Sequence, residues 1–135
     1  MTDLRAQLPV AGYALQLAPS YAAQVRGNGW TVAPASGGNN RREPVEISVD
    51  VITAPAPEAG RLENVGARRL RRTEETSAGG SSGEAVTVTY LEDLGPVHIR
   101  YQQVRYVDGS APRFELDELI RRGGLLVARA EAGRP

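Results

Sequence analysis

The chain has 135 residues, with 16 arginines, 16 acidic residues, no lysine and no cysteine. This length fits one domain of the common size, roughly 100–150 residues, which can fold without a metal or a disulfide. A formal net charge of zero provides no general attraction to nucleic acid or to an anionic membrane. The missing residue types exclude a Schiff-base lysine, a P-loop lysine and thiol catalysis.

The first half of the chain contains short runs that alternate apolar and polar residues between Gly- or Pro-rich turns. A period of two is typical of strands with one face on a core and the other face in water. The strands predicted in this half are 12–17, 30–32 and 45–53. Residues 20–26 are ambiguous and fit a helical turn, whereas 36–42 have the composition of a polar, Gly-rich loop.

The second half continues the same pattern. Residues 61–76 lack clean helical spacing, so a strand over 67–73 with Arg69 and Arg71 facing outward is favoured. Turns are expected at 92–96 and at Asp108-Gly109. The other strands predicted in this half are 84–91, 97–107 and 125–127.

A short amphipathic helix is predicted after the last turn. Ser110 and Pro112 suit its cap and first turn, and Gly123-Gly124 would end it. The predicted fold class is therefore α+β, a mainly antiparallel sheet of about five to seven strands with one C-terminal amphipathic helix packed on it. We expect residues 1–135 to form a single domain, with an ordered core over about 11–128.

Common catalytic constellations are poorly represented. His98 is the sole histidine of the chain, and we expect it at the surface or in a cross-strand pair. One histidine without cysteine does not suit a zinc site. The adjacent carboxylates Glu74-Glu75 and Glu92-Asp93 would point to opposite faces of a strand, so we expect both pairs to be solvated. The expectation is a protein without enzyme activity, metal or cofactor.

Two charged or flexible stretches remain. Residues 77–83 are rich in Gly and Ser and lie between strands, which favours a hairpin loop over a phosphate cradle. Arg68, Arg69, Arg71 and Arg72 form a basic cluster without nearby aromatic residues for base stacking. We expect a solvated face with cross-strand ion pairs or, less simply, a docking surface for an acidic partner.

The order of these features resembles that of a known family. The opening strand at Gly12-Tyr13 is closed by a proline. The later parts are the strand from Arg69-Leu70, the Gly/Ser-rich loop ending at Glu84, strands 86–91 and 99–103, and the helix led by Phe114. Over most of residues 12–126 the pattern is similar to small periplasmic immunity proteins that protect bacteria from their own type VI secreted cell-wall hydrolases.

The resemblance implies a non-catalytic inhibitor that blocks the active-site groove of a peptidoglycan-degrading toxin (a muramidase). It implies a protein partner, the cognate effector toxin, with no nucleic acid and no stable membrane insertion. The implied partner-binding residues are Glu74, Glu75, Gly80, Ser81, Ser82, Gly83 and Glu84. The implied location is the periplasm if a native signal peptide has been removed, and otherwise the cytoplasm.

The residues themselves leave three classes of function open. The first is a protein-binding inhibitor, the second is a small envelope accessory or scaffold module of the bacterial secretion machinery, and the third is an enzyme or ligand-binding domain. A tight 1:1 complex with a hydrolase would separate the first class from the second. A deep apolar pocket with convergent polar groups would favour the third.

Overall fold

The computed structural model describes residues 5–6, 9–35, 46–53, 61–65, 68–78, 84–94, 97–107 and 114–129. As the sequence predicted, the fold is α+β, mostly antiparallel sheet with a short helix near the C-terminus. The elements are β1 (Arg5–Ala6), β2 (Tyr13–Leu17), β3 (Tyr21–Arg26), β4 (Gly29–Pro34), β5 (Ile47–Ile52), β6 (Arg61–Val65), β7 (Arg68–Ala78), β8 (Glu84–Asp93), β9 (His98–Val107), α1 (Glu115–Arg121) and β10 (Leu125–Arg129).

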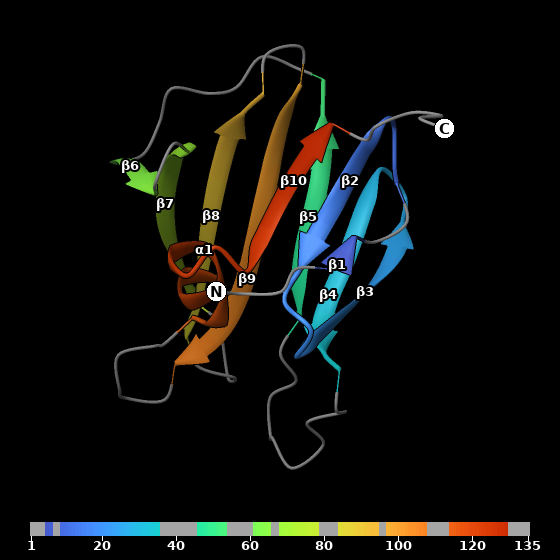
Figure 1. Ribbon diagram of the computed structural model, residues 1–135. Coiled ribbons are helices and arrows are strands. Elements are labelled where there is room, and N and C mark those ends of the chain that lie inside the picture. Colours follow the sequence, from blue (N-terminus) through green and yellow to red (C-terminus); the bar gives the residue numbers. More distant parts are fainter. Residues whose placement is uncertain are drawn as a thin grey trace, which may run out of the picture.

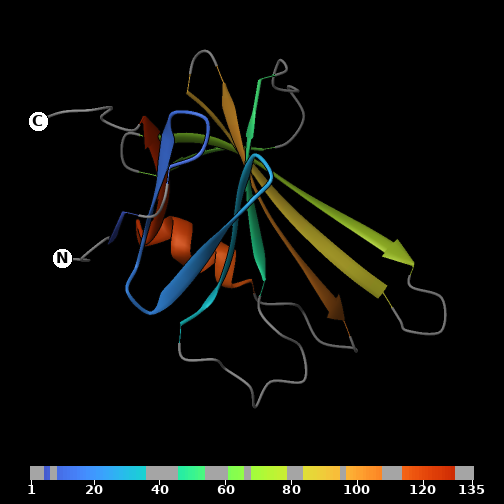
Figure 2. The same cartoon turned by 90° about the vertical axis from the view of Figure 1, so that its right-hand side faces the viewer.

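The strands form two antiparallel sheets in two layers. Within the described ranges, the large sheet has seven strands in the order β3-β4-β5-β9-β8-β7-β6, and the small sheet has three in the order β1-β2-β10. The small sheet and α1 lie on the same face of the large sheet (Figure 1). We call the covered face of the large sheet its inner face and the opposite face its outer face. Viewed from the side, β7, β8 and β9 all extend beyond α1 (Figure 2). We call the outer pair of these strands, β7 and β8, the arm.

The core lies between the two layers. Burial alternates along β2 and β5 with a period of two, as expected for strands whose other face meets solvent. The fully buried large side chains include Trp30, Tyr90, Tyr101, Leu15, Leu17, Ile47, Leu70, Ile99, Leu116, Ile120 and Leu125. Because these residues come from both sheets and from α1, one apolar cluster joins the layers.

Residues 20–26 correct one expectation, since Tyr21–Arg26 form β3 and the segment makes no helical turn. Gly27, at φ +59°, and Asn28 make a two-residue turn that pairs β3 with β4 over six consecutive positions. Gly29 begins β4 where the backbone of β5 passes so close that a Cβ would overlap the carbonyl oxygen of Val49. Pairing with the next strand, across this two-residue turn, therefore decides the conformation of this ambiguous segment.

Two further boundaries differ from the expectations. The strand favoured over 67–73 is confirmed, but it runs on to Ala78 as β7 and pairs with β6. The turn expected at 92–96 begins later, because Glu92 and Asp93 still belong to β8 and pair with β9. Pairing with β9 therefore extends β8 beyond the residues in which apolar and polar side chains alternate.

Among the residues that the structure describes, none next to the start of helix α1 caps it with a side chain. Phe114 occupies the N-cap position and makes no side-chain capping hydrogen bond, while Ser110 and Pro112 lie outside the described residues. Instead, the N–H of Leu116 donates to Oε1 of Gln103 at 2.9 Å, so a side chain of β9 caps the helix from beside it. Gly123, at φ +70°, follows its C-terminus, which confirms the predicted stop. The described residues contain no helix long and apolar enough to cross a membrane.

Candidate functional site

A first charged cluster lies at the base of the arm, on the inner face. Arg68 donates to both carboxylate oxygens of Glu92, from Nε at 3.0 Å and from Nη2 at 2.9 Å. The Tyr101 hydroxyl donates to Glu92 Oε1 at 2.6 Å and also accepts from Arg68 at 3.2 Å. Arg68 Nη1 donates to the carbonyl of Leu125 at 2.9 Å. This cluster therefore joins three strands of the large sheet to β10 of the small sheet.

A second cluster repeats this chemistry four residues further along β7. Arg72 donates to both carboxylate oxygens of Asp117 on α1, at 3.0 Å each, and to Oε2 of Glu74 at 2.8 Å. The Tyr90 hydroxyl makes a short hydrogen bond to Asp117. Residues four apart on a strand face the same way, so both arginines reach the inner face. The second cluster ties α1 to the arm.

The two clusters share one geometry, in which an arginine, a carboxylate and a tyrosine contact one another. In both, the guanidinium carbon lies 5.8 Å from the centroid of the tyrosine ring, Arg68 with Tyr101 and Arg72 with Tyr90. Paired donors in the plane of the guanidinium suit a carboxylate better than a single ammonium would. Both clusters are therefore well satisfied internally.

The surroundings of the two tyrosines and of Arg72 raise the pKa of each of these side chains. Burial raises the pKa of Tyr101 well above its usual range, and the charge of Glu92 raises it further. Burial and the hydrogen bond to Asp117 likewise raise the pKa of Tyr90. Hydrogen bonds to Asp117 raise the pKa of Arg72. At neutral pH both phenols stay protonated, so these clusters serve as anchors between elements.

The Arg68–Glu92 pair contradicts two expectations. The Glu92-Asp93 pair was expected in solvent, and Asp93 is exposed, but Glu92 is buried at 6% exposure. Arg69 is exposed, as its predicted outward direction implies, and the cross-strand ion pair of Arg68 with Glu92 was also among the expectations. The single solvated face is wrong, because Arg68 and Arg72 face the core side. Leu70, fully buried between the two arginines, is the sequence signal that could have placed them on the inner face.

His98 is a further correction. Of its two expected positions, at the surface or in a cross-strand pair, the first is wrong, because His98 is buried together with its neighbour Ile99. In register it lies opposite Asp93 of β8 and Ile52 of β5. Two successive buried residues mean that both faces of β9 are covered at this end, which strand alternation alone does not reveal.

The residues predicted to bind a partner lie on the arm. Glu74 and Glu75 are exposed near the middle of β7, on opposite faces as predicted, and Glu74 is held by Arg72. Glu84 begins β8 opposite Ala78, which confirms a hairpin around the Gly/Ser-rich stretch. The predicted contact residues within that stretch, Gly80, Ser81, Ser82 and Gly83, lie outside the described residues, as does the predicted loop 36–42.

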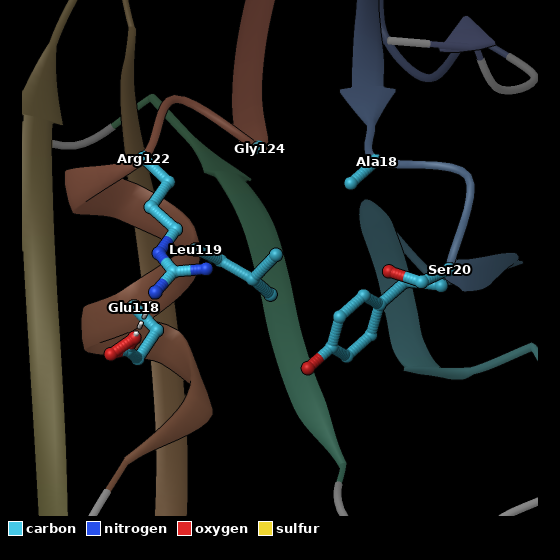
Figure 3. Close-up of a pocket in the computed structure, with 7 residues that line it drawn as sticks. Ala18, Ser20, Glu118, Leu119, Arg122 and Gly124 are labelled. Carbon is cyan, nitrogen blue, oxygen red and sulfur yellow. Dashed lines mark ion pairs between the residues drawn. The ribbon is translucent and has the colours of Figure 1, made fainter. Parts of the chain in front are cut away.

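A groove of about 360 Å³ lies between the end of α1 and the turn from β2 to β3 (Figure 3). Leu119 and Ala18 provide its apolar lining. The ion pair between Arg122 and Glu118, at 3.6 Å, lies at its side, with side chains 79% and 62% exposed. A small-molecule site requires polar groups that are buried and point toward one another, whereas the polar groups of this ion pair are solvated. The described residues also contain no group of three or more metal-binding side chains.

Comparisons with known proteins inform the fold alone. No protein-family model and no curated protein matches the chain. A crystal structure from Bacteroides thetaiotaomicron VPI-5482 is similar, with a TM-score of 0.60 at 10% sequence identity. The match covers 94% of this chain and 48% of the other, so this chain spans about half the length of that protein.

Proposed function

We propose that this chain is a non-catalytic protein-binding inhibitor, an immunity protein that neutralises a secreted bacterial cell-wall-degrading toxin by blocking its active-site groove. The observation that carries the proposal is the β7–β8 arm. It extends beyond α1 (Figure 2) and exposes Glu74 and Glu75, while partly buried ion pairs hold its base. A rigid base reduces the conformational entropy lost when such an arm enters a groove.

The chemistry of the arm supports this role. The carboxylate of Glu74 is 47% exposed and already oriented by Arg72 at 2.8 Å. Glu75 is exposed on the other face of the same strand. Carboxylates presented in this way complement an electropositive groove that binds the carboxylates and amides of a peptidoglycan substrate.

The identity of the partner rests on the family resemblance of the sequence. A peptidoglycan hydrolase acts in the periplasm, so the proposed inhibitor acts there too. The internally satisfied Arg–carboxylate–Tyr clusters are consistent with a scaffold that positions a contact surface and performs no reaction.

The first experiment is a pull-down of the tagged chain from lysate of its source organism, read by mass spectrometry. We expect a cell-wall hydrolase in stoichiometric amount, which the purified chain then inhibits in a peptidoglycan turbidity assay. Absence of any hydrolase at both low and moderate salt would contradict the proposal and favour the envelope accessory module instead.

Variants of the arm then test the mode of binding. Glu74→Gln with Glu75→Gln should weaken binding of the hydrolase by about tenfold or more, because both removed charges lie in the contact. Replacing residues 79–83 with Asn-Gly keeps the pairing of Ala78 with Glu84 and should weaken the complex as well. The matched control is Glu118→Gln, an exposed carboxylate on α1. Equal affinity of all these proteins for the hydrolase would refute a contact through the arm.

A further inference from the structure

The two edges of the large sheet differ in how well they are protected. Edge strands usually carry charges, proline or bulges that prevent pairing with another chain. Strand β6, at one edge, carries Arg61 and Glu63. Strand β3, at the other edge, pairs with β4 over six positions without a bulge, and its one charge is the terminal Arg26. Among the described residues, no strand pairs with the edge of β3 that lies away from β4.

The register shows which backbone N–H and carbonyl groups of β3 point away from β4, toward the free edge of the sheet. The Ala35 N–H donates to the Ser20 carbonyl at 2.9 Å, so positions 20 and 35 form a hydrogen-bonded pair. Hydrogen-bonded and non-hydrogen-bonded residue pairs alternate along an antiparallel ladder. The N–H and carbonyl groups of Ala23 and Val25 therefore point away from β4, toward the free edge of the sheet. Val25 is also 46% exposed, one of the large apolar side chains left in solvent.

We propose that β3 pairs with β3 of a second copy of this chain, antiparallel and around a two-fold axis at Gln24. In this register Ala23 lies opposite Val25 of the second copy, and Val25 lies opposite its Ala23. Each outward N–H and carbonyl of these two residues then finds a partner. The contact is isologous, as in most homodimers, and it joins two large sheets into one.

Neighbouring registers satisfy fewer backbone groups. An axis at Ala23 would place Val25 opposite Tyr21 of the copy, whose N–H already donates to the Ala18 carbonyl at 3.0 Å. An axis at Val25 would place Ala23 opposite Gly27, which lies in a turn with φ +59°. The axis at Gln24 avoids both conflicts.

Side chains and charges also suit the axis at Gln24. The two Gln24 amides meet on the outer face, where one can donate to the other. Arg26 lies opposite Ala22 of the copy, so the two Arg26 residues stand about 14 Å apart, beyond the Debye length at physiological salt. On the inner face, each Val25 lies beside Ala23 of the copy and diagonal to its Tyr21, which covers exposed apolar surface.

This pairing uses the edge opposite the β7 and β6 strands, so it is independent of the proposed inhibitor function. A dimer of this form leaves both arms open at its far ends. If the arms bind a partner, one dimer can hold two partner molecules.

Disulfide trapping tests the register directly, because the chain contains no cysteine. Gln24→Cys would place two thiols at a non-hydrogen-bonded pair with Cα atoms about 4.5 Å apart, within the range of a disulfide. We expect covalent dimers under mild oxidation. Ala22→Cys is the control on the same face, where the two thiols would stand about 14 Å apart and should not link. Equal linking by both variants, or by neither, would overturn the proposal.

Sedimentation velocity over a concentration series tests the dimer without a covalent trap. We expect a concentration-dependent equilibrium in the unmodified chain, and Val25→Lys should raise its dissociation constant by about tenfold or more. Val104→Lys is the matched control, since Val104 is 47% exposed on β9 and away from β3. A chain that stays monomeric throughout, or an equal effect of both substitutions, would refute the dimer and leave this edge for a strand of another protein.

Discussion

At the scale of single residues, the inner face tolerates ionised groups because each one meets its partner through two contacts. Glu92 is buried, yet both of its oxygens accept from Arg68 and one also accepts from Tyr101. Removing charges from water costs several kcal/mol per ion, so a buried pair adds little net stability to the fold. Removing only one of the two charges is strongly destabilising, because the other charge stays buried without a partner. The Arg68–Glu92 pair should therefore behave as a unit.

Arg68→Met tests that unit. It leaves the Glu92 carboxylate buried without its counter-charge, and we expect a loss of about 3–5 kcal/mol in the free energy of unfolding, measured by urea denaturation. Adding Glu92→Leu should recover most of the loss, because both charges are then absent. The control Arg69→Met, at an exposed position, should change stability by less than about 0.5 kcal/mol. A mild effect of Arg68→Met alone would show that water reaches Glu92.

The buried phenol of Tyr101 predicts a loss of stability at high pH. Burial holds its pKa well above the usual value, so in the folded state it stays protonated where the unfolded state ionises. This contribution is fully present below about pH 10 and falls by about 1.4 kcal/mol per pH unit above it, until the folded pKa is reached. Tyr101→Phe should therefore show a shallower decline in unfolding free energy between about pH 10 and pH 11.5. Parallel declines in both proteins would mean that Tyr101 ionises in the folded state.

At the scale of elements, α1 depends on its neighbour for a cap. It spans seven residues, too few to be stable as an isolated helix in water. Gln103 is 2% exposed, accepts from the N–H of Leu116 and donates to Glu115 at 2.8 Å. The helix is therefore positioned by β9 as much as by its own apolar face.

Gln103→Leu should cost about 1–2 kcal/mol in unfolding free energy, because it removes the cap and leaves a helix N–H without an acceptor. Its neighbour Gln102 donates to Thr89 at 3.1 Å on the other face of β9, and Gln102→Leu should cost less. Urea denaturation of both variants compares the two. If Gln102→Leu proved the more damaging, the capping role of Gln103 would be wrong.

At the scale of the whole molecule, the two layers are joined by polar contacts as well as by the apolar core. Arg68 reaches the Leu125 carbonyl of the small sheet, and Arg72 reaches Asp117 of α1. Since both arginines belong to β7 of the large sheet, separation of the layers would break both clusters at once.

We therefore expect one cooperative unfolding transition. Trp30 is the sole tryptophan of the chain and is buried in the large sheet, so its fluorescence reports on that layer. Far-UV circular dichroism reports on both layers, and the two midpoints in urea should coincide. An earlier dichroism change at constant fluorescence would show that the small sheet and α1 separate first.

Alternation along single strands determined much of this fold from the sequence. Strands β2, β5, β8 and β9 were predicted near their observed bounds, because a period of two between core and solvent is a local property of each segment. The same alternation predicted that Glu74 and Glu75 of the candidate site lie on opposite faces of their strand. The contact role of residues 80–83 stays a prediction, since they lie outside the described residues.

Only the tertiary structure decided which strands and side chains meet. The ambiguous segment 20–26 became a strand through pairing with β4, and β10 joined β2 instead of the large sheet. Arg68 meets a carboxylate 24 residues away, and Arg72 meets one 45 residues away. The free energy of such contacts depends on burial by segments far away in the sequence. The pattern of residues around either arginine therefore does not reveal the contact. The sequence therefore determined the strands, whereas the sheets, the buried charges and the unprotected edge at β3 depended on long-range packing.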